Sequence, residues 1–248
     1  MSDLVGRSAL VTGGASGIGA ACARALAARG ATVTVADIDA AGAAAVAGEL
    51  GGESWAVDLL DVTALEELEL GTDILVNNAG VQHISPIEEF APQRFRDLLT
   101  LMVEAPFLLV RAALPHMYRQ GWGRIVNISS VHGLRASPYK VAYVTAKHGL
   151  EGLSKVTALE GGPHGVTSNC VNPGYVRTPL VDEQIADQAA AHGIPEQEVL
   201  EKVLLTESAI KRLVEPDEVA ALVSWLAAPE AGMVTGAAYT MDGGWSAR

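Results

Sequence analysis

A glycine-rich turn near the N-terminus constrains the fold more than any other feature of this chain. The turn, Thr12–Gly19, follows a short apolar run, Ser8–Val11, and precedes an alanine-rich helical segment, Ala20–Ala28. Three glycines of this turn allow the backbone to approach a pyrophosphate closely, and the helix N-terminus stabilises its charge. They are Gly13, Gly17 and Gly19. The sequence therefore predicts a dinucleotide site, and the alternative is a tight turn that needs glycine for its conformation alone.

Apolar runs and helical segments alternate along the rest of the chain. Further strands are expected at Ala31–Ala36, Trp55–Val57, Ile74–Val76, Arg124–Ile128, Val166–Val171 and Gly236–Met241. Helices are expected at Ala40–Leu50, Thr63–Leu70, Pro92–Arg119, Val181–Ala191, Glu196–Leu205 and from Glu215 through Ala227. This alternation predicts one α/β domain over residues 1–248, a Rossmann-type doubly wound parallel sheet with helices on both faces. The polar helices within about residues 178–213 are interpreted as a small substrate lid.

Composition excludes several classes of function. A net charge of −12 over 248 residues argues against a nucleic-acid partner or an anionic membrane surface, because both require a positive footprint. The two cysteines, Cys22 and Cys170, stand far apart in apolar stretches and are typical of buried reduced thiols, and no metal-ligand spacing appears. The N-terminal residues lack a basic region followed by an apolar run, so a soluble cytoplasmic protein without a membrane partner is expected.

Ser130, Tyr143 and Lys147 form a candidate catalytic group. Tyr143 and Lys147 are four residues apart, so they share one face of a helix. An ammonium within about 4–6 Å of a phenol favours the phenolate and is expected to lower the phenol pKa. Ser130, at the end of a strand, could hold a substrate oxygen against this phenol. The same tyrosine–lysine spacing is common on ordinary helices, so the pair alone decides nothing.

Asp37, at the end of the second strand, predicts which dinucleotide is bound. A carboxylate there accepts hydrogen bonds from both ribose hydroxyls of adenosine and repels a 2′-phosphate. The sequence places no arginine or lysine beside it, so NAD is favoured over NADP. The alternative is a solvated loop carboxylate. Asp58 follows the third strand, where it either meets the adenine edge or caps a helix.

Four separated motifs together resemble the short-chain dehydrogenase/reductase family. They are Thr12–Gly19, Asn77–Gly80, the Ser130/Tyr143/Lys147 group and Pro173–Gly174. The resemblance implies that Tyr143 takes the proton from a secondary alcohol, that Lys147 holds the nicotinamide ribose, and that Ser130 orients the reacting oxygen. It also implies a homotetramer. The cofactor residues implied are Gly13, Ser16, Gly17, Ile18, Gly19, Asp37, Asp58, Leu59, Asn78, Tyr143, Lys147, Val176 and Thr178.

Residues around the reaction centre resemble one group within this family, the D-3-hydroxybutyrate dehydrogenases. The substrate-binding residues implied are Gln82, Ser130, His132, Lys140, Tyr143, Tyr175 and Gln184. A carboxylate needs charge-assisted donors, which Lys140, His132 and Gln82 can supply. The expected reaction is NAD-dependent interconversion of (R)-3-hydroxybutyrate and acetoacetate. The alternatives are another short-chain alcohol, polyol or 3-oxoacyl oxidoreductase, or a catalytically weak NAD-binding scaffold or sensor.

Individual residues also have structural interpretations. Lys140 could be a solvated lysine at a helix start, His132 a loop histidine bonded to backbone, and Gln184 a solvent-facing residue. Two features depart from the family. Met102 stands where the family usually places a helix asparagine that holds a water next to the lysine, and a thioether cannot anchor that water. The segment Asp61–Gly71 is shorter than is usual and should truncate the surface on the cofactor side.

Overall fold

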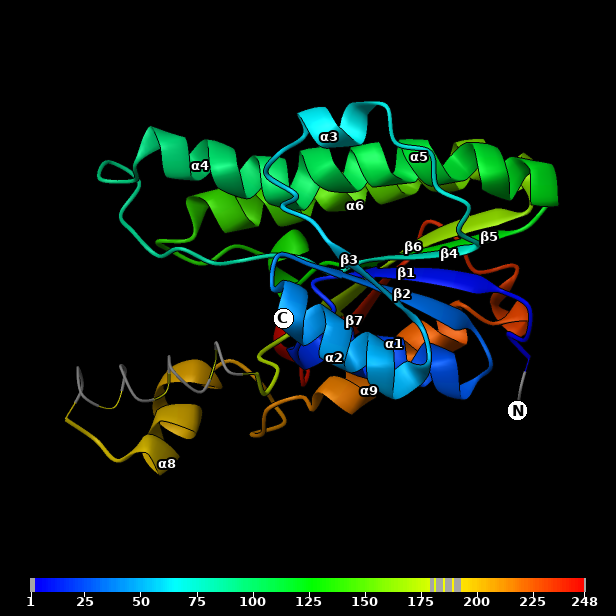
Figure 1. Cartoon of the computed structure of the whole chain (residues 1–248). Helices are drawn as coiled ribbons and strands as arrows, with labels where there is room; N and C mark the ends of the chain where they lie inside the picture. The colour runs from blue at the N-terminus through cyan, green and yellow to red at the C-terminus, as the bar shows by residue number, and fades with distance from the viewer. Residues whose placement is uncertain (1–2, 179–180, 182–184, 186–188, 190–192, 248) are drawn as a thin grey trace.

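The computed structural model describes residues 3–178, 181, 185, 189 and 193–247, which form one parallel sheet covered by helices on both faces (Figure 1). Seven strands follow the order β3-β2-β1-β4-β5-β6-β7, and every neighbouring pair is parallel. The strands are β1 (Ser8–Thr12), β2 (Thr32–Asp37), β3 (Glu53–Ala56), β4 (Ile74–Asn77), β5 (Gly123–Ile128), β6 (Val166–Pro173) and β7 (Ala238–Met241). This confirms the predicted doubly wound sheet.

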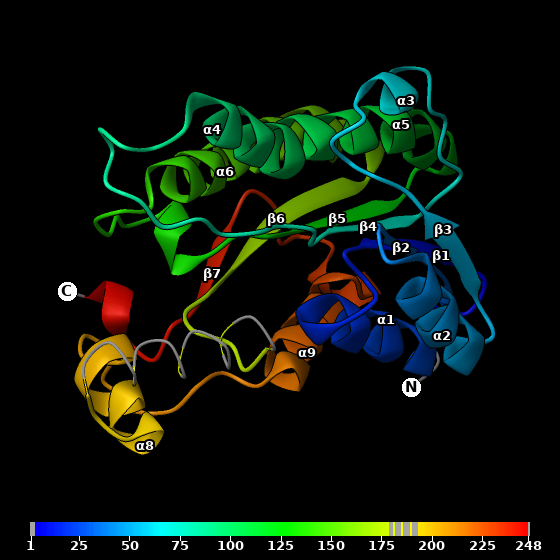
Figure 2. The same cartoon turned by 60° about the vertical axis from the view of Figure 1, so that its left-hand side comes forward.

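The helices divide between the two faces of the sheet, as the two views of the ribbon show (Figures 1 and 2). On one face lie α1 (Gly17–Ala28), α2 (Ala40–Leu50) and α9 (Pro216–Leu226). On the other lie α3 (Thr63–Glu66), α4 (Pro92–Leu99), α5 (Ala105–Gln120) and α6 (Val141–Gly161). The short helix α8 (Glu196–Val199) stands away from the sheet, near the C-terminal residues in Figure 2.

Side chains point alternately to the two faces along each strand, and they pack into one hydrophobic core on each face of the sheet. Val11 of β1 is fully buried and packs in the cluster that contains α1, α2 and α9 side chains. Its neighbour Leu10 points to the opposite face, where it packs with Leu109 and Met117 of α5. Successive strand side chains point to opposite faces, so a strand that is buried on both sides must be apolar throughout. The continuous apolar runs in the sequence have this origin.

A continuous helical stretch, Pro92–Gln120, joins α4 and α5 through a π-helical segment, Thr100–Glu104. It agrees with the predicted helix Pro92–Arg119 to within one residue. Its length and hydropathy would suffice to cross a membrane, but half of its most apolar window is buried inside the fold. That burial is typical of a core helix in a sheet protein. Met102 lies in the π-helical segment and is 1% exposed.

Several predicted boundaries were wrong. The helix expected at Thr63–Leu70 is a single turn, Thr63–Glu66, because the chain then runs extended to hydrogen-bond α5 through Leu70 N–H and the Ala112 carbonyl. The strand expected at Trp55–Val57 is Glu53–Ala56, which is the register that pairs with β2. The expected strand Gly236–Met241 begins at Ala238, and the helix expected at Glu196–Leu205 is α8 followed by a π-helical turn. Most of the expected helix Val181–Ala191 lies outside the described residues. The expected helix from Glu215 through Ala227 is α9, and a capping box formed by Glu215 and Glu218 fixes its start.

Candidate active site

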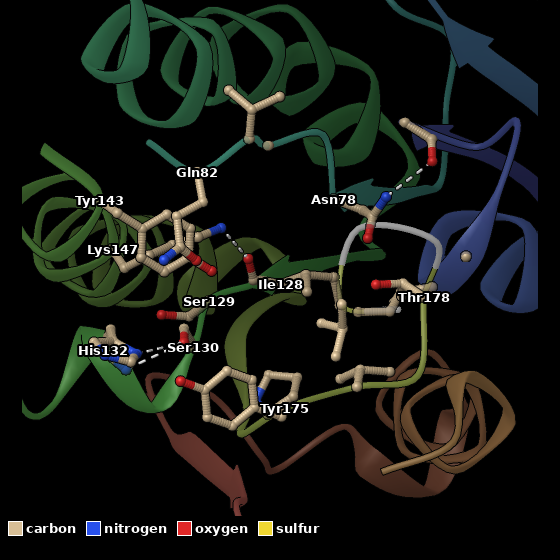
Figure 3. A pocket seen from close by; sticks show the side chains of 18 of the residues that line it. Asn78, Gln82, Ile128, Ser129, Ser130, His132, Tyr143, Lys147, Tyr175 and Thr178 are labelled. Atoms are coloured by element: carbon tan, nitrogen blue, oxygen red, sulfur yellow. Dashed lines mark hydrogen bonds between the residues drawn. The ribbon is translucent and has the colours of Figure 1, made fainter. Parts of the chain in front are cut away.

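A cleft of about 680 Å³ opens at the carboxyl ends of the strands, where the order reverses between β1 and β4. In doubly wound sheets this is where ligands bind. Figure 3 shows Asn78 and Thr178 at one end of the cleft and Ser130, His132 and Tyr143 at the other. We call the first end, with the glycine turn and Asp37, the cofactor half. The second end, with Gln82, Lys140 and Tyr175, is the substrate half.

Two glycines of the turn, Gly13 and Gly19, have no room for a side chain. A β-carbon on Gly13, whose φ is +62°, would lie 2.9 Å from the Ala79 α-carbon, and one on Gly19 would lie 2.1 Å from the Gly13 carbonyl oxygen. The Asn78 side chain donates to the carbonyls of Thr12 (2.9 Å) and Gly13 (3.0 Å), which ties the turn to the end of β4. Gly19 therefore shapes the turn and does not line the cleft. Every other described residue that was predicted for the cofactor does line it.

The first turn of α1 faces the cleft beside this turn. Ser16 is the N-cap residue, and its side chain makes no capping hydrogen bond. Gly17 and Ile18 follow it, and all three line the cleft. The free N–H groups of a helix start favour an anion. With no room for a side chain at Gly13 and Gly19, these backbone groups fit the pyrophosphate of a nicotinamide dinucleotide.

Asp37 is held rigidly at the end of β2. Its carboxylate accepts hydrogen bonds from Ala15 N–H (2.9 Å) and Asp39 N–H (3.0 Å). The lysine and arginine side chains among the described lining residues are Arg94, Lys140 and Lys147, none of which belongs to β1, β2 or the glycine turn. Asp58 also lines the cleft, but its carboxylate accepts from Leu60 N–H (2.9 Å) and so stabilises a local turn.

Tyr143 and Lys147 project from α6 toward Ser130, which follows β5 (Figure 3). Lys147 Nζ donates to the Ile128 carbonyl (2.7 Å) and lies 5.5 Å from the centre of the Tyr143 ring. Burial lowers the pKa of Lys147 to about 8, against the opposing influence of Cys170 and Glu151. The expected net lowering of the Tyr143 pKa is wrong, although the Lys147 ammonium lies near the ring as predicted. Burial raises that pKa, and the hydrogen bond with Ser130 only partly opposes it.

His132 is a buried neutral side chain that contacts Ser130. Burial, followed by the charges of Lys140 and His148, lowers the His132 pKa to about 4. Its Nδ1 lies 3.4 Å from Ser130 Oγ, and its Nε2 lies 3.0 Å from Ser137 Oγ. The His132 backbone N–H also donates to Ser130 Oγ (3.2 Å). Both ring nitrogens are therefore engaged by hydroxyls, so His132 orients Ser130 as well as bordering the substrate half.

Two further side chains place hydrogen-bond donors in the substrate half. Lys140 is 9% exposed, and its Nζ lies 3.5 Å from the Tyr175 hydroxyl and 5.4 Å from the centre of that ring. None of the ion pairs formed among the described residues includes Lys140, and burial lowers its pKa. In the same part of the structure, Gln82 Nε2 is buried and has no hydrogen-bond partner among the described residues. Gln184, the last predicted substrate residue, lies outside the described residues.

Sequence reasoning missed three groups. Ser137 contacts His132, and the Ile128 carbonyl accepts a hydrogen bond from Lys147. No sequence spacing predicts either contact. Glu151 is 4% exposed and stands one helical turn after Lys147, a spacing that was readable in the sequence. Trp245 also lines the cleft, with the centre of its ring 5.3 Å from that of His132.

Comparisons with known proteins agree with this geometry. A family model described as Enoyl-(Acyl carrier protein) reductase matches residues 13–246. The chain is 43% identical to a D-beta-hydroxybutyrate dehydrogenase from Cupriavidus necator, covering 99% of this chain and 100% of that protein. It is 42% identical to a D-beta-hydroxybutyrate dehydrogenase from Rhizobium meliloti, covering 98% and 99%. The chain belongs to the short-chain dehydrogenase/reductase family.

A solved structure extends the comparison to the fold of this family. It comes from Agrobacterium tumefaciens, is described as a candidate 2-deoxy-D-gluconate 3-dehydrogenase, and contains bound NADP. The match has a TM-score of 0.87 at 31% identity and covers 100% of this chain and 99% of that one. This short-chain dehydrogenase/reductase is thus an oxidoreductase that acts on a small molecule, and its cleft fits a nicotinamide dinucleotide.

Proposed function

We propose that this enzyme uses NAD to interconvert (R)-3-hydroxybutyrate and acetoacetate. The observation that carries the proposal is Lys140, a buried cation at the Ser130 and Tyr143 end of the cleft that forms no ion pair among the described residues. A buried charge without a partner is costly, and a substrate carboxylate supplies the missing partner. The two hydroxybutyrate dehydrogenases at 42–43% identity support the same substrate.

A short hydroxy acid matches the polarity of the substrate half. Its carboxylate meets Lys140 Nζ and Gln82 Nε2, which has no hydrogen-bond partner among the described residues, and its hydroxyl meets Ser130 and Tyr143. Because His132 is neutral and bonded to Ser130, it contributes orientation and no second positive charge. The ring of Tyr175 closes one side of this region as an apolar wall (Figure 3). The lid, including Gln184, completes the clamp in this proposal.

The chain's own residues manage the proton and the reacting oxygen. The nicotinamide, when bound, supplies or accepts the hydride. Tyr143 accepts the hydroxyl proton during oxidation and returns it during reduction, and Ser130 holds the same oxygen. Lys147, fixed by the Ile128 carbonyl, provides the positive charge that stabilises the phenolate and holds the nicotinamide ribose. Asp37 favours NAD because its fixed carboxylate repels a 2′-phosphate.

We also propose a cytoplasmic homotetramer. Large apolar side chains stand exposed on α5, α6 and the segment after α9, which suits contacts between copies of the chain. They include Phe107 (48% exposed), Leu159 (79%) and Met233 (95%). Sedimentation of the purified protein tests this assembly, and a monomer at all concentrations would contradict it.

The test of the activity is NADH formation with (R)-3-hydroxybutyrate, its enantiomer and a neutral secondary alcohol, each with NAD and with NADP. We expect turnover of the (R)-acid with NAD to exceed every other combination. Turnover of the neutral alcohol alone would leave the family chemistry standing and overturn the substrate. Equal rates with NADP would overturn the role of Asp37.

A further inference from the structure

A buried carboxylate, Glu151, lies behind the catalytic group. It stands on α6, four residues after Lys147 and eight after Tyr143, and is 4% exposed. It takes part in none of the ion pairs formed among the described residues. Burying a carboxylate costs free energy of folding unless hydrogen bonds or a nearby positive charge offset it. Its contacts show what it can do.

Glu151 is connected to Ser130 through one amide. Asn172, at the end of β6, donates from Nδ2 to Glu151 Oε1 (2.5 Å) and to the Ser130 carbonyl (2.9 Å). Asn172 is fully buried, so its amide has few alternative partners. The carboxylate therefore fixes the amide, and the amide fixes the backbone of the serine that holds the substrate oxygen.

The chain leaves room for this carboxylate at Gly133. A β-carbon there would lie 2.9 Å from Glu151 Oε1, 2.5 Å from Ser129 Oγ and 3.1 Å from the Lys147 carbonyl oxygen. Ser129 Oγ is buried and has no hydrogen-bond partner among the described residues. The Glu151 carboxylate thus lies in a polar environment between α6 and the segment that carries His132.

Two groups, Cys170 and Glu151, raise the pKa of Lys147 against the effect of burial, and of these only Glu151 is a carboxylate. Among the described residues, the titratable groups near Lys147 are Tyr143 and Glu151 on α6 and Cys170 on β6. Burial raises the pKa of the Cys170 thiol, so this thiol stays protonated and uncharged at neutral pH. From the π-helical segment Met102 presents only a thioether, 3.2 Å from where a Gly80 β-carbon would stand.

We propose that Glu151 is a positioning residue, which holds Ser130 through Asn172 and supplies the buried negative charge that keeps Lys147 an ammonium. The proposal rests on the family chemistry and holds whichever alcohol is the substrate. It also accounts for Met102. The family usually places a helix asparagine near the lysine. At that position this chain has the thioether of Met102, and the carboxylate of Glu151 on α6 supplies a polar group near Lys147 instead.

The test is a pH titration of Lys147 that is monitored by NMR of protein with lysine labelled with ¹³C at Cε. The Lys147 signal is assigned by its loss in Lys147→Met. Removing a nearby negative charge lowers the pKa of an ammonium. In Glu151→Gln we expect the Lys147 midpoint to move from about 8 to lower pH by about one unit, the size expected for charges several ångströms apart in a partly screened interior. Glu151→Asp keeps the charge and should keep the midpoint near that of the wild type.

Further variants separate charge from structure. Glu151→Leu removes both the charge and the acceptor for Asn172, so its Lys147 midpoint should fall as in Glu151→Gln while kcat falls about tenfold further. Glu160→Gln, at an exposed position on the same helix, is the matched control and should change neither. An unmoved Lys147 midpoint in both Glu151→Gln and Glu151→Leu would overturn the proposal. This titration needs no substrate, so it is decided independently of the proposed activity.

Discussion

The two halves of the cleft present different groups to a ligand, backbone groups in the cofactor half and side chains in the substrate half. In the cofactor half the binding groups belong to the backbone. Gly13 and Gly19 have no space for a β-carbon, and the Ser16 side chain makes no capping hydrogen bond to the first N–H groups of α1. In the substrate half the binding groups are side-chain donors: Lys140 Nζ, which forms no ion pair among the described residues, and the buried Nε2 of Gln82, which has no hydrogen-bond partner among them. A buried cation without an ion pair destabilises the substrate half until a ligand binds, which is the usual compromise at a functional site.

The largest effect should come from the phenol of Tyr143. Tyr143→Phe removes the only proton acceptor that we place at the alcohol oxygen, so kcat should fall about a thousandfold. The dissociation constant for NAD, measured by fluorescence titration, should change less than about twofold, because the cofactor half is untouched. Tyr139→Phe, at a side chain that is 60% exposed, is the control. Appreciable turnover in Tyr143→Phe would refute the phenolate mechanism.

A smaller and more selective loss is expected at Lys140. Lys140→Met removes a charge-assisted hydrogen bond, so KM for the hydroxy acid should rise about 10- to 100-fold. KM for NAD and for a neutral alcohol should stay unchanged. Because a buried cation that forms no ion pair among the described residues is removed, Tm should rise. Lys155→Met, on the exposed side of α6, controls for charge. An equal rise of KM for the neutral alcohol would remove Lys140 from the carboxylate clamp.

The matching change in the cofactor half is Asp37→Asn. The amide oxygen can still accept from Ala15 N–H, but the negative charge that repels a 2′-phosphate is gone. The ratio of kcat/KM for NAD to that for NADP should fall about tenfold, with KM for the hydroxy acid unaffected. Asp61→Asn, in the exposed loop after β3, should leave the ratio as it is. An unchanged ratio in Asp37→Asn would mean that another group selects the cofactor.

The same contrast explains what the sequence could predict. The glycine turn, the alternation of strands and helices and the Tyr143–Lys147 spacing are local patterns, and local geometry decides them. The helix expected from Glu215 is of this kind, and in the structure it begins there with a capping box. Strand limits were predicted less well, since β3 is defined by its pairing with β2 and not by its own residues.

Contacts across long separations in the chain were beyond sequence reasoning. Asn172 joins Glu151 to the Ser130 carbonyl, and each of these three residues belongs to a different segment of the fold. The direction of the Tyr143 pKa was also wrong, because spacing shows that Lys147 is near but not that it donates to the Ile128 carbonyl or that the phenol is desolvated. Burial and competing partners, which set such values, come only from the assembled structure.

The smallest effect is expected at Tyr175, the wall of the substrate half. Its hydroxyl lies at the limit of hydrogen bonding from Lys140 Nζ, at 3.5 Å, so the hydroxyl stabilises the lysine only weakly. Tyr175→Phe keeps the ring and its contact with the cation, and KM for the hydroxy acid should change about threefold or less. Initial-rate measurements beside Lys140→Met decide the matter. A loss as large as in Lys140→Met would place the hydroxyl in the clamp itself, and the substrate half would then hold its carboxylate by a tyrosine as well as by a lysine.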